Sequence, residues 1–235
     1  MRYPVLLAAA LILFCAQSSL LPRDPAMAQR ICPMSLVLAV DVSSSVDRRE
    51  YRLQSEGLAL ALTDPAVMEH ILATGGLWLS AFEWSGRFNH QLLLDWTYLN
   101  DLASIVAAAD AIRSVPRSTN EYPTAMGYAM GYASLLMQRA PERCLRRVID
   151  VAGDGVTNDG FHPVSAYRAF DFGDVTINGL VILGAEPDPL AYYQQNVIRG
   201  PGAFIEVAEG YDNYAIAMRR KLIREITGGR LASLD

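Results

Sequence analysis

The chain has 235 residues, a formal net charge of −5 and a pI near 5.2, and 51% of its residues are hydrophobic. This length and composition suit a single globular domain of about 200 residues, large enough to bury a full core without metal or disulfide cross-links. Arginine supplies almost all of the positive charge and forms no basic stripe along the sequence, which argues against a nucleic-acid partner.

The first 28 residues have the pattern of a cleaved export signal. Arg2 precedes the apolar run Val5–Cys15, and the residues AMA at Ala26–Ala28 form an A-x-A cleavage site. The run is shorter than the roughly twenty apolar residues that span a bilayer, so an uncleaved anchor is the less favoured alternative. We expect residues 1–28 to be a signal peptide and residues 29–235 to form one domain. That domain is expected to be periplasmic or secreted, with no stable membrane insertion.

Predicted strands and helices alternate along the rest of the chain. Short apolar runs bounded by turn residues predict strands at 36–40, 77–82, 91–96, 146–155, 176–183 and 203–207. Helical periodicity and capping signals predict helices at 47–62, 65–72, 99–114, 124–138, 163–170, 189–197 and 211–227. The second and third strands are close enough to form a hairpin. This order predicts a doubly wound α/β fold, with a mostly parallel central sheet, one antiparallel edge strand and helices on both faces.

Local signals mark two of the predicted helices. Asp47 followed by Glu50 has the spacing of a capping box and starts the first helix. Gly127 and Gly131 in the fourth helix indicate close packing, which we expect to be against the sheet.

Two predicted strands end in a carboxylate, Asp41 and Asp154. Ligands of doubly wound sheets bind at the carboxyl ends of strands, where the strand order reverses. Asp41 begins a D-x-S-x-S pattern, whose alternation directs Asp41, Ser43 and Ser45 toward one region. Two acids and two hydroxyls match the oxygen ligands that Mg²⁺ prefers. The alternative is an ordinary strand-to-helix turn at the serines and a loop cap at Asp154.

These residues resemble the metal-ion-dependent adhesion site (MIDAS) of the von Willebrand factor A (VWA) domain family. The family pattern is D-x-S-x-S after the first strand, a threonine in a later loop, and Asp-Gly after the fourth strand. The sequence matches the last part at Asp154-Gly155. Thr124, which precedes a small, apolar helix start, best matches the threonine, and Thr119 is the alternative. The resemblance covers residues 34–226 and is closest to exported bacterial single-domain members.

The resemblance implies a cation site and a function. Mg²⁺ is the implied cation, with Mn²⁺ or Ca²⁺ as alternatives, and an acidic side chain of a partner protein would take its open position. The implied function is therefore metal-dependent protein binding of the adhesion type, not enzymatic activity. A magnesium-dependent hydrolase using the same ligands is the alternative function, and a scaffold without a working site is a third. The implied metal ligands are Asp41, Ser43, Ser45, Thr124 and Asp154.

The cysteines that follow the predicted signal peptide are Cys32 and Cys144, and two cysteines in an oxidising compartment favour one disulfide. Cys32 lies nine residues before Asp41, and Cys144 lies ten before Asp154. In the VWA family the strands that carry these two acids are adjacent and parallel, so the resemblance implies a Cys32–Cys144 disulfide. Two separate thiols are the alternative, because a disulfide requires Cα atoms within about 7 Å.

Several side chains are expected near the strand ends without matching a motif. Trp84 either contributes to a partner-contacting rim or packs beneath a loop. Asp159 is expected to be a turn residue, with a metal-binding role as the alternative. The other expected members of the rim are Glu121, Tyr122 and Phe161.

Overall fold

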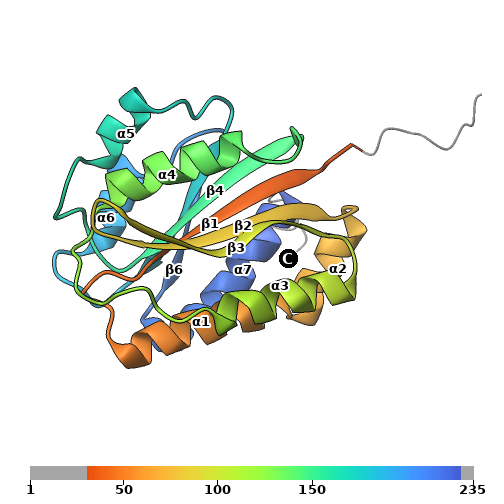
Figure 1. Ribbon diagram of the computed structural model, residues 1–235, viewed down its shortest axis with the longest axis horizontal. Helices are drawn as coiled ribbons and strands as arrows, with labels where there is room; N and C mark the ends of the chain where they lie inside the picture. Colours follow the sequence, from red (N-terminus) through yellow and green to blue (C-terminus); the bar gives the residue numbers. More distant parts are fainter. Residues whose placement is uncertain (1–30, 229–235) are drawn as a thin grey trace, which may run out of the picture. The chain divides into compact units, whose positions relative to one another are not determined.

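The computed structural model describes residues 31–228 (Figure 1). The signal peptide predicted for residues 1–28 lies outside the described residues. The described part contains a six-stranded sheet in the order β3-β2-β1-β4-β5-β6, in which only β3 runs antiparallel to its neighbour. The predicted fold class is confirmed. The strands are β1 (Met34–Asp41), β2 (Leu77–Ser85), β3 (Asn89–Leu99), β4 (Arg146–Gly153), β5 (Thr176–Ile182) and β6 (Ile205–Ala208).

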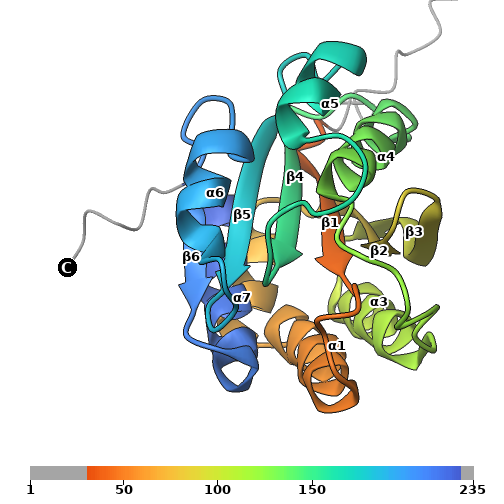
Figure 2. The ribbon, with the colours of Figure 1, turned by 90° about the vertical axis from the view of Figure 1, so that its left-hand side faces the viewer.

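Helices cover both faces of this sheet (Figures 1 and 2). One face packs against α1 (Arg48–Leu62), α2 (Pro65–Ala73), α3 (Leu102–Ser114) and α7 (Tyr214–Thr227). The other packs against α4 (Met126–Gln138), α5 (Pro163–Ala169) and α6 (Pro189–Asn196). A 3₁₀ turn, Tyr211–Asn213, precedes α7. Within residues 31–228, no helix combines the length and the apolar character needed to cross a membrane.

Strand β1 shows why the sequence forms this core. All of its residues are buried, and alternate side chains serve opposite faces. Leu36 and Leu38 join the core on the α1 and α7 side, while Val37 and Ala39 join the core on the α4 side. A strand covered on both faces is expected to be largely apolar on both, and Leu36–Val40 is the continuous apolar run seen in the sequence.

Among the predicted element boundaries that differ from the structure, one is decided by strand pairing and another by a helix-capping side chain. Strand β2 continues through Ser85, because Glu83 and Trp84 still pair with β3. Helix α3 begins at Leu102 rather than at Leu99, because β3 extends to Leu99 and the Asp101 side chain caps the helix. The capping box of Asp47 and Glu50 at the start of α1 is confirmed.

The close packing predicted from the glycines of α4 is confirmed, but its expected partner is wrong. A Cβ at Gly127 would lie 2.0 Å from the carbonyl oxygen of Phe161, and a Cβ at Gly131 would lie 2.6 Å from the ring of Phe170. These aromatic residues flank α5. The glycines therefore bring α4 against the segment that carries α5, and the sheet is not their contact.

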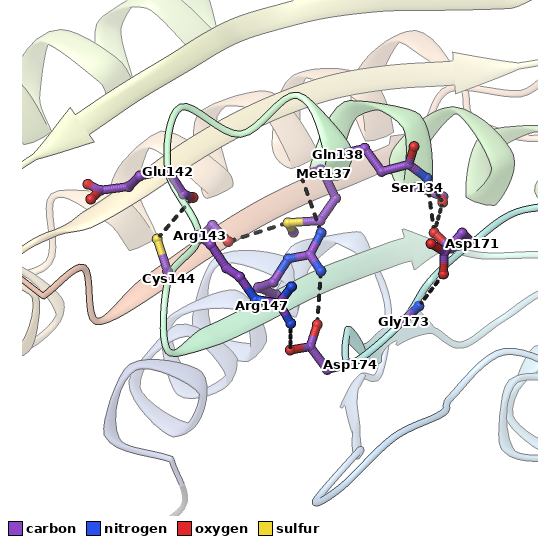
Figure 3. Close-up of polar contacts among 11 residues, drawn as sticks. Ser134, Met137, Gln138, Glu142, Arg143, Cys144, Arg147, Asp171, Gly173 and Asp174 are labelled. Atoms are coloured by element: carbon purple, nitrogen blue, oxygen red, sulfur yellow. Dashed lines mark hydrogen bonds and ion pairs between the residues drawn. The ribbon is translucent and has the colours of Figure 1, made fainter.

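A disulfide joins Cys32 to Cys144 at the amino ends of β1 and β4, so the predicted pairing is confirmed. The two Cα atoms are 4.6 Å apart, and the Leu145 N–H donates to the Cys32 carbonyl at 2.9 Å. Figure 3 shows the surroundings of Cys144: Asp174 accepts hydrogen bonds from Arg143 and Arg147 at 2.8 and 2.9 Å. The amino ends of these strands are thus cross-linked by the disulfide and flanked by ion pairs, while Asp41 lies at the opposite, carboxyl end of β1.

Candidate metal centre

The polar residues predicted from the strand ends meet at the point where the strand order reverses. Strand β1 lies between β2 and β4. After β1 the chain adds β2 and β3 on one side of it, and then adds β4, β5 and β6 on the other side. Asp41 is the last residue of β1, and Asp154 directly follows β4. Because β1 and β4 are parallel and adjacent, their carboxyl ends place the two acids side by side.

A row of hydrogen bonds connects the hydroxyl groups to Asp154. Thr124 Oγ1 donates to Ser43 Oγ at 3.2 Å, and the hydroxyls of Ser43 and Ser45 are 3.1 Å apart. Ser45 Oγ donates to Asp154 Oδ1 at 3.0 Å. Ser43, Thr124 and Asp154 are buried, whereas Ser45 is exposed. The structure therefore brings all five predicted site residues to one place, with an opening to solvent at Ser45.

Asp41 lies at the bottom of this group and is fully buried. Its Oδ1 accepts the N–H of Ser43 at 2.8 Å, while Oδ2 is buried and has no hydrogen-bond partner among the described residues. Burial, and secondarily the negative charge of Asp154, raise the pKa of Asp41 to about 8. A buried carboxylate oxygen without a partner is unfavourable unless a donor or a cation neutralises it.

The donor set fits a hard divalent cation. Carboxylate and hydroxyl oxygens are the ligands of Mg²⁺ and related ions, whereas soft metals favour thiolates. Among residues 31–228, no cluster of three or more histidines, cysteines or acids has the geometry of a metal site. A cation at this place would thus have mostly neutral hydroxyl ligands, and it would offset both the burial of the Asp41 carboxylate and its repulsion by Asp154.

The Thr124 loop is held against the other strand ends by its backbone. The Thr124 N–H donates to Asn158 Oδ1 at 2.8 Å, and its carbonyl accepts the N–H of Asn158 at 3.0 Å. Thr124 precedes α4, so its side chain belongs to a loop and not to the predicted helix. The Thr119 hydroxyl instead accepts the N–H of Glu121 at 3.2 Å. Of the two threonines considered from the sequence, Thr124 is the one that contacts Ser43.

Several residues that support this group carried no recognised sequence motif. Gln54 of α1 is buried and donates to the Asp41 carbonyl at 2.9 Å. A detectable signal was its place on the buried face of α1, one turn before Leu58, where an apolar residue is expected. The hydroxyl of Tyr193 is buried beside Asp41 and Gly153, close enough that a Cβ at Gly153 would lie within 3.0 Å of both side chains. No local pattern predicts Tyr193, because α6 is far from both Asp41 and Gly153 in the sequence.

The expected aromatic rim is only partly exposed. Trp84 is fully buried in the core on the α4 side, so its role in a partner-contacting rim is wrong and its packing role is right. Tyr122 is 48% exposed, whereas Phe161 is half-buried against the ring of Tyr128. Asp159 forms an ion pair with Arg87 at 2.7 Å, which ties it to the turn between β2 and β3.

The sequence comparisons assign the family. The model of the DUF1194 family, described as a protein of unknown function, matches residues 31–230. This chain belongs to the DUF1194 family. A search of curated proteins finds no match to the DUF1194 chain.

Solved structures show that this DUF1194 member has the VWA fold. Proximal thread matrix protein 1 (PTMP1) from the mussel byssus matches with a TM-score of 0.61 and 12% identity over 84% of this chain and 48% of that chain. The von Willebrand factor type A protein from Catenulispora acidiphila matches with a TM-score of 0.60 and 16% identity over 83% of this chain and 43% of that chain. The chain therefore spans about half the length of these structures or less.

A third match is similar in length to this chain. The vWF domain of the type V pili tip protein Mfa5 from Porphyromonas gingivalis has a TM-score of 0.54 and 13% identity, over 85% of this chain and 96% of that domain. These identities establish a shared fold. The predicted resemblance to the VWA family is thereby confirmed.

Proposed function

We propose that this DUF1194 protein is an exported protein-binding module that holds a divalent cation at Asp41, Ser43, Ser45, Thr124 and Asp154. The observation that carries the proposal is the meeting of these oxygen donors around the unpartnered Oδ2 of Asp41. Mg²⁺ is the proposed ion, with Mn²⁺ or Ca²⁺ as alternatives. The bound cation supplies a positive charge and an open coordination position for a carboxylate of a partner protein.

The residues of this site have distinct roles in the proposal. Asp41 and Asp154 provide the negative charge, while the hydroxyls of Ser43, Ser45 and Thr124 complete the coordination without adding more. Because three of the five ligands are neutral hydroxyls, the ion stays electrophilic, and its open coordination position can take an external carboxylate. Asp41 is buried and Ser45 is exposed, so a partner would approach from the Ser45 side.

The neighbouring structures support binding outside the cytoplasm. One PTMP1 structure has a zinc-occupied MIDAS motif and matches with a TM-score of 0.58 and 12% identity over 84% of this chain and 48% of that chain. Mfa5 is a pili tip protein, and PTMP1 is a matrix protein of the mussel byssus. The Cys32–Cys144 disulfide also suits an oxidising compartment. A non-enzymatic role in the periplasm or outside the cell follows from the proposal.

Metal binding is tested by titrating Mg²⁺ into chelator-treated protein and measuring the heat and the melting temperature. At a hundredfold excess over its dissociation constant, a bound ion is expected to stabilise the fold by about 2.7 kcal/mol. Replacing Ser43→Ala and Ser45→Ala together should weaken the affinity at least about tenfold, a loss seen even for groups that only orient metal ligands. Ser44→Ala is the matched control, because this exposed serine lies between them and is not a proposed ligand. Equal losses in both variants would contradict the ligand assignment.

The binding function is tested by affinity capture of the mature protein with Mg²⁺, with a chelator, and with the Ser43→Ala/Ser45→Ala variant. The proposal expects a partner that is retained with Mg²⁺ and lost in the other two conditions, because a cation bridge needs both the ion and its ligands. The captured partner should lose binding when its contacting acidic residue is changed to the amide. Identical partners in all three conditions would show that binding is not metal-bridged.

A further inference from the structure

A pocket of about 380 Å³ lies between the first turns of α1 and the segment that leads from α3 to α4. Three arginines line it although the whole chain carries a net charge of −5. Arg48 and Arg52 are exposed and four residues apart on α1, so they share one face of the helix. The pocket-lining residues are Arg48, Tyr51, Arg52, Arg117, Ser118, Thr119 and Asn120.

No acidic residue is among those that line the pocket. Within the described part of the chain, Arg48, Arg52 and Arg117 form no ion pair, whereas Arg49, on the same turn of α1, pairs with Asp212. Asp47, the residue before Arg48, accepts two backbone N–H groups as the cap of α1 and interacts with the charge of Arg52 without forming an ion pair. The pocket is therefore a local concentration of positive charge.

Arg117 forms a fixed wall of the pocket and connects it to the metal site. Its Nη2 donates to the carbonyls of Val42 and Ser43 at 2.9 and 3.1 Å, which belong to the loop that carries the proposed ligands. Its guanidinium lies 5.4 Å from the centre of the Tyr51 ring, and its buried Nε–H has no acceptor among the described residues. The pocket therefore directly adjoins the candidate metal centre.

A buried acid beneath the pocket anchors two of the residues that line it. Glu83 of β2 is fully buried, and its two oxygens accept the Ser118 N–H at 2.5 Å and the Tyr51 hydroxyl at 3.3 Å. These hydrogen bonds attach the α3–α4 segment and α1 to strand β2 of the sheet. The positions of Tyr51 and Ser118 are thus determined by the core, which gives the pocket a preformed shape.

We propose that this pocket binds a second carboxylate of the same partner, so that the partner contributes an acidic segment with at least two acidic side chains. This inference rests on the proposed function, in which the first carboxylate binds the cation. Guanidinium groups form paired, charge-assisted hydrogen bonds with carboxylates, and the two free arginines on α1 supply the necessary donors. Because the chain carries a net charge of −5, this cluster of three arginines attracts an acidic segment against the overall charge of the protein.

The test uses a capped hexaglutamate peptide as the probe, titrated at constant ionic strength with Mg²⁺ and with a chelator. The Arg48→Gln/Arg52→Gln variant should bind the peptide about tenfold more weakly, the effect expected for two exposed ion pairs. Its affinity for Mg²⁺ alone should match that of the unchanged protein. The matched control is Arg139→Gln/Arg168→Gln, which removes the same charge from two exposed arginines, one directly after α4 and one in the last turn of α5, and should leave peptide binding within about twofold.

The outcomes separate this inference from the proposed function. Peptide binding that persists with chelator and depends on Arg48 and Arg52 supports the pocket even if Mg²⁺ does not bind, in which case only the proposed function fails. Equal effects of the two double variants would overturn the inference, whatever the metal does. It would also be overturned if the peptide bound under neither condition, or if a sulfated oligosaccharide bound in its place.

Discussion

Replacing Lys221 with methionine is expected to destabilise the fold by about 3–5 kcal/mol, the loss typical when one partner of a buried ion pair is removed. Lys221 of α7 is fully buried, and its Nζ lies 2.9 Å from Asp150 Oδ1 and 2.6 Å from Glu225 Oε1. Burial lowers the pKa of Lys221, but the two carboxylates outweigh it and raise that pKa. Without the ammonium group, two buried carboxylates would face each other with no cation between them.

Urea unfolding measures this effect, and two variants serve as controls. Arg220→Met on the same helix removes a partly exposed pair with Glu206 and should cost about 1 kcal/mol or less. Adding Asp150→Asn and Glu225→Gln to Lys221→Met should recover much of the lost stability, because neutral groups tolerate burial better than unpaired charges. The assignment of a buried charge cluster is wrong if Lys221→Met loses no more stability than Arg220→Met.

Reducing the Cys32–Cys144 disulfide is expected to lower the free energy of unfolding by about 4–5 kcal/mol. The cysteines are 112 residues apart, so the cross-link closes a long loop and strongly restricts the unfolded chain. The loop contains β1 through α4, including four of the five proposed metal ligands. Reduction should therefore also weaken the cooperation between the two halves of the sheet during unfolding.

The measurement compares urea unfolding of oxidised and reduced protein, together with the Cys32→Ala/Cys144→Ala variant. The reduced protein keeps both cysteine side chains, so its difference from the oxidised protein reports the cross-link alone. The double-alanine variant adds the loss of two buried sulfur atoms and should be less stable than the reduced protein. Two alkylatable thiols in the non-reduced mature protein would contradict the disulfide.

Much of the fold could be predicted because its determinants are local. The central part of β1, Leu36–Val40, is a continuous apolar run, since both faces of this strand are covered by helices, and such a run is visible without any knowledge of tertiary contacts. The capping box of Asp47 and Glu50 is equally local. Boundaries were less accurate where the pairing of two strands decides them, as at the end of β2.

The sequence by itself determined the chemistry of the strand ends. Asp41, Ser43 and Ser45 are close in the sequence, so the turn after β1 brings them together whatever the remainder of the fold does. Adding Asp154 required only that two acid-terminated strands lie side by side, which a doubly wound sheet provides.

Only the tertiary structure decided which distant groups join them. It brings Thr124 to Ser43 across 81 positions of the chain and Arg117 to the Val42 carbonyl across 75. It also buries Trp84, which the sequence left either exposed or packed. The two contacts depend on how loops from separate strands lie against one another, and the burial of Trp84 depends on the packing of α4 against the sheet. Such long-range contacts leave no periodic pattern in the sequence, because each is made by a single side chain on an irregular segment.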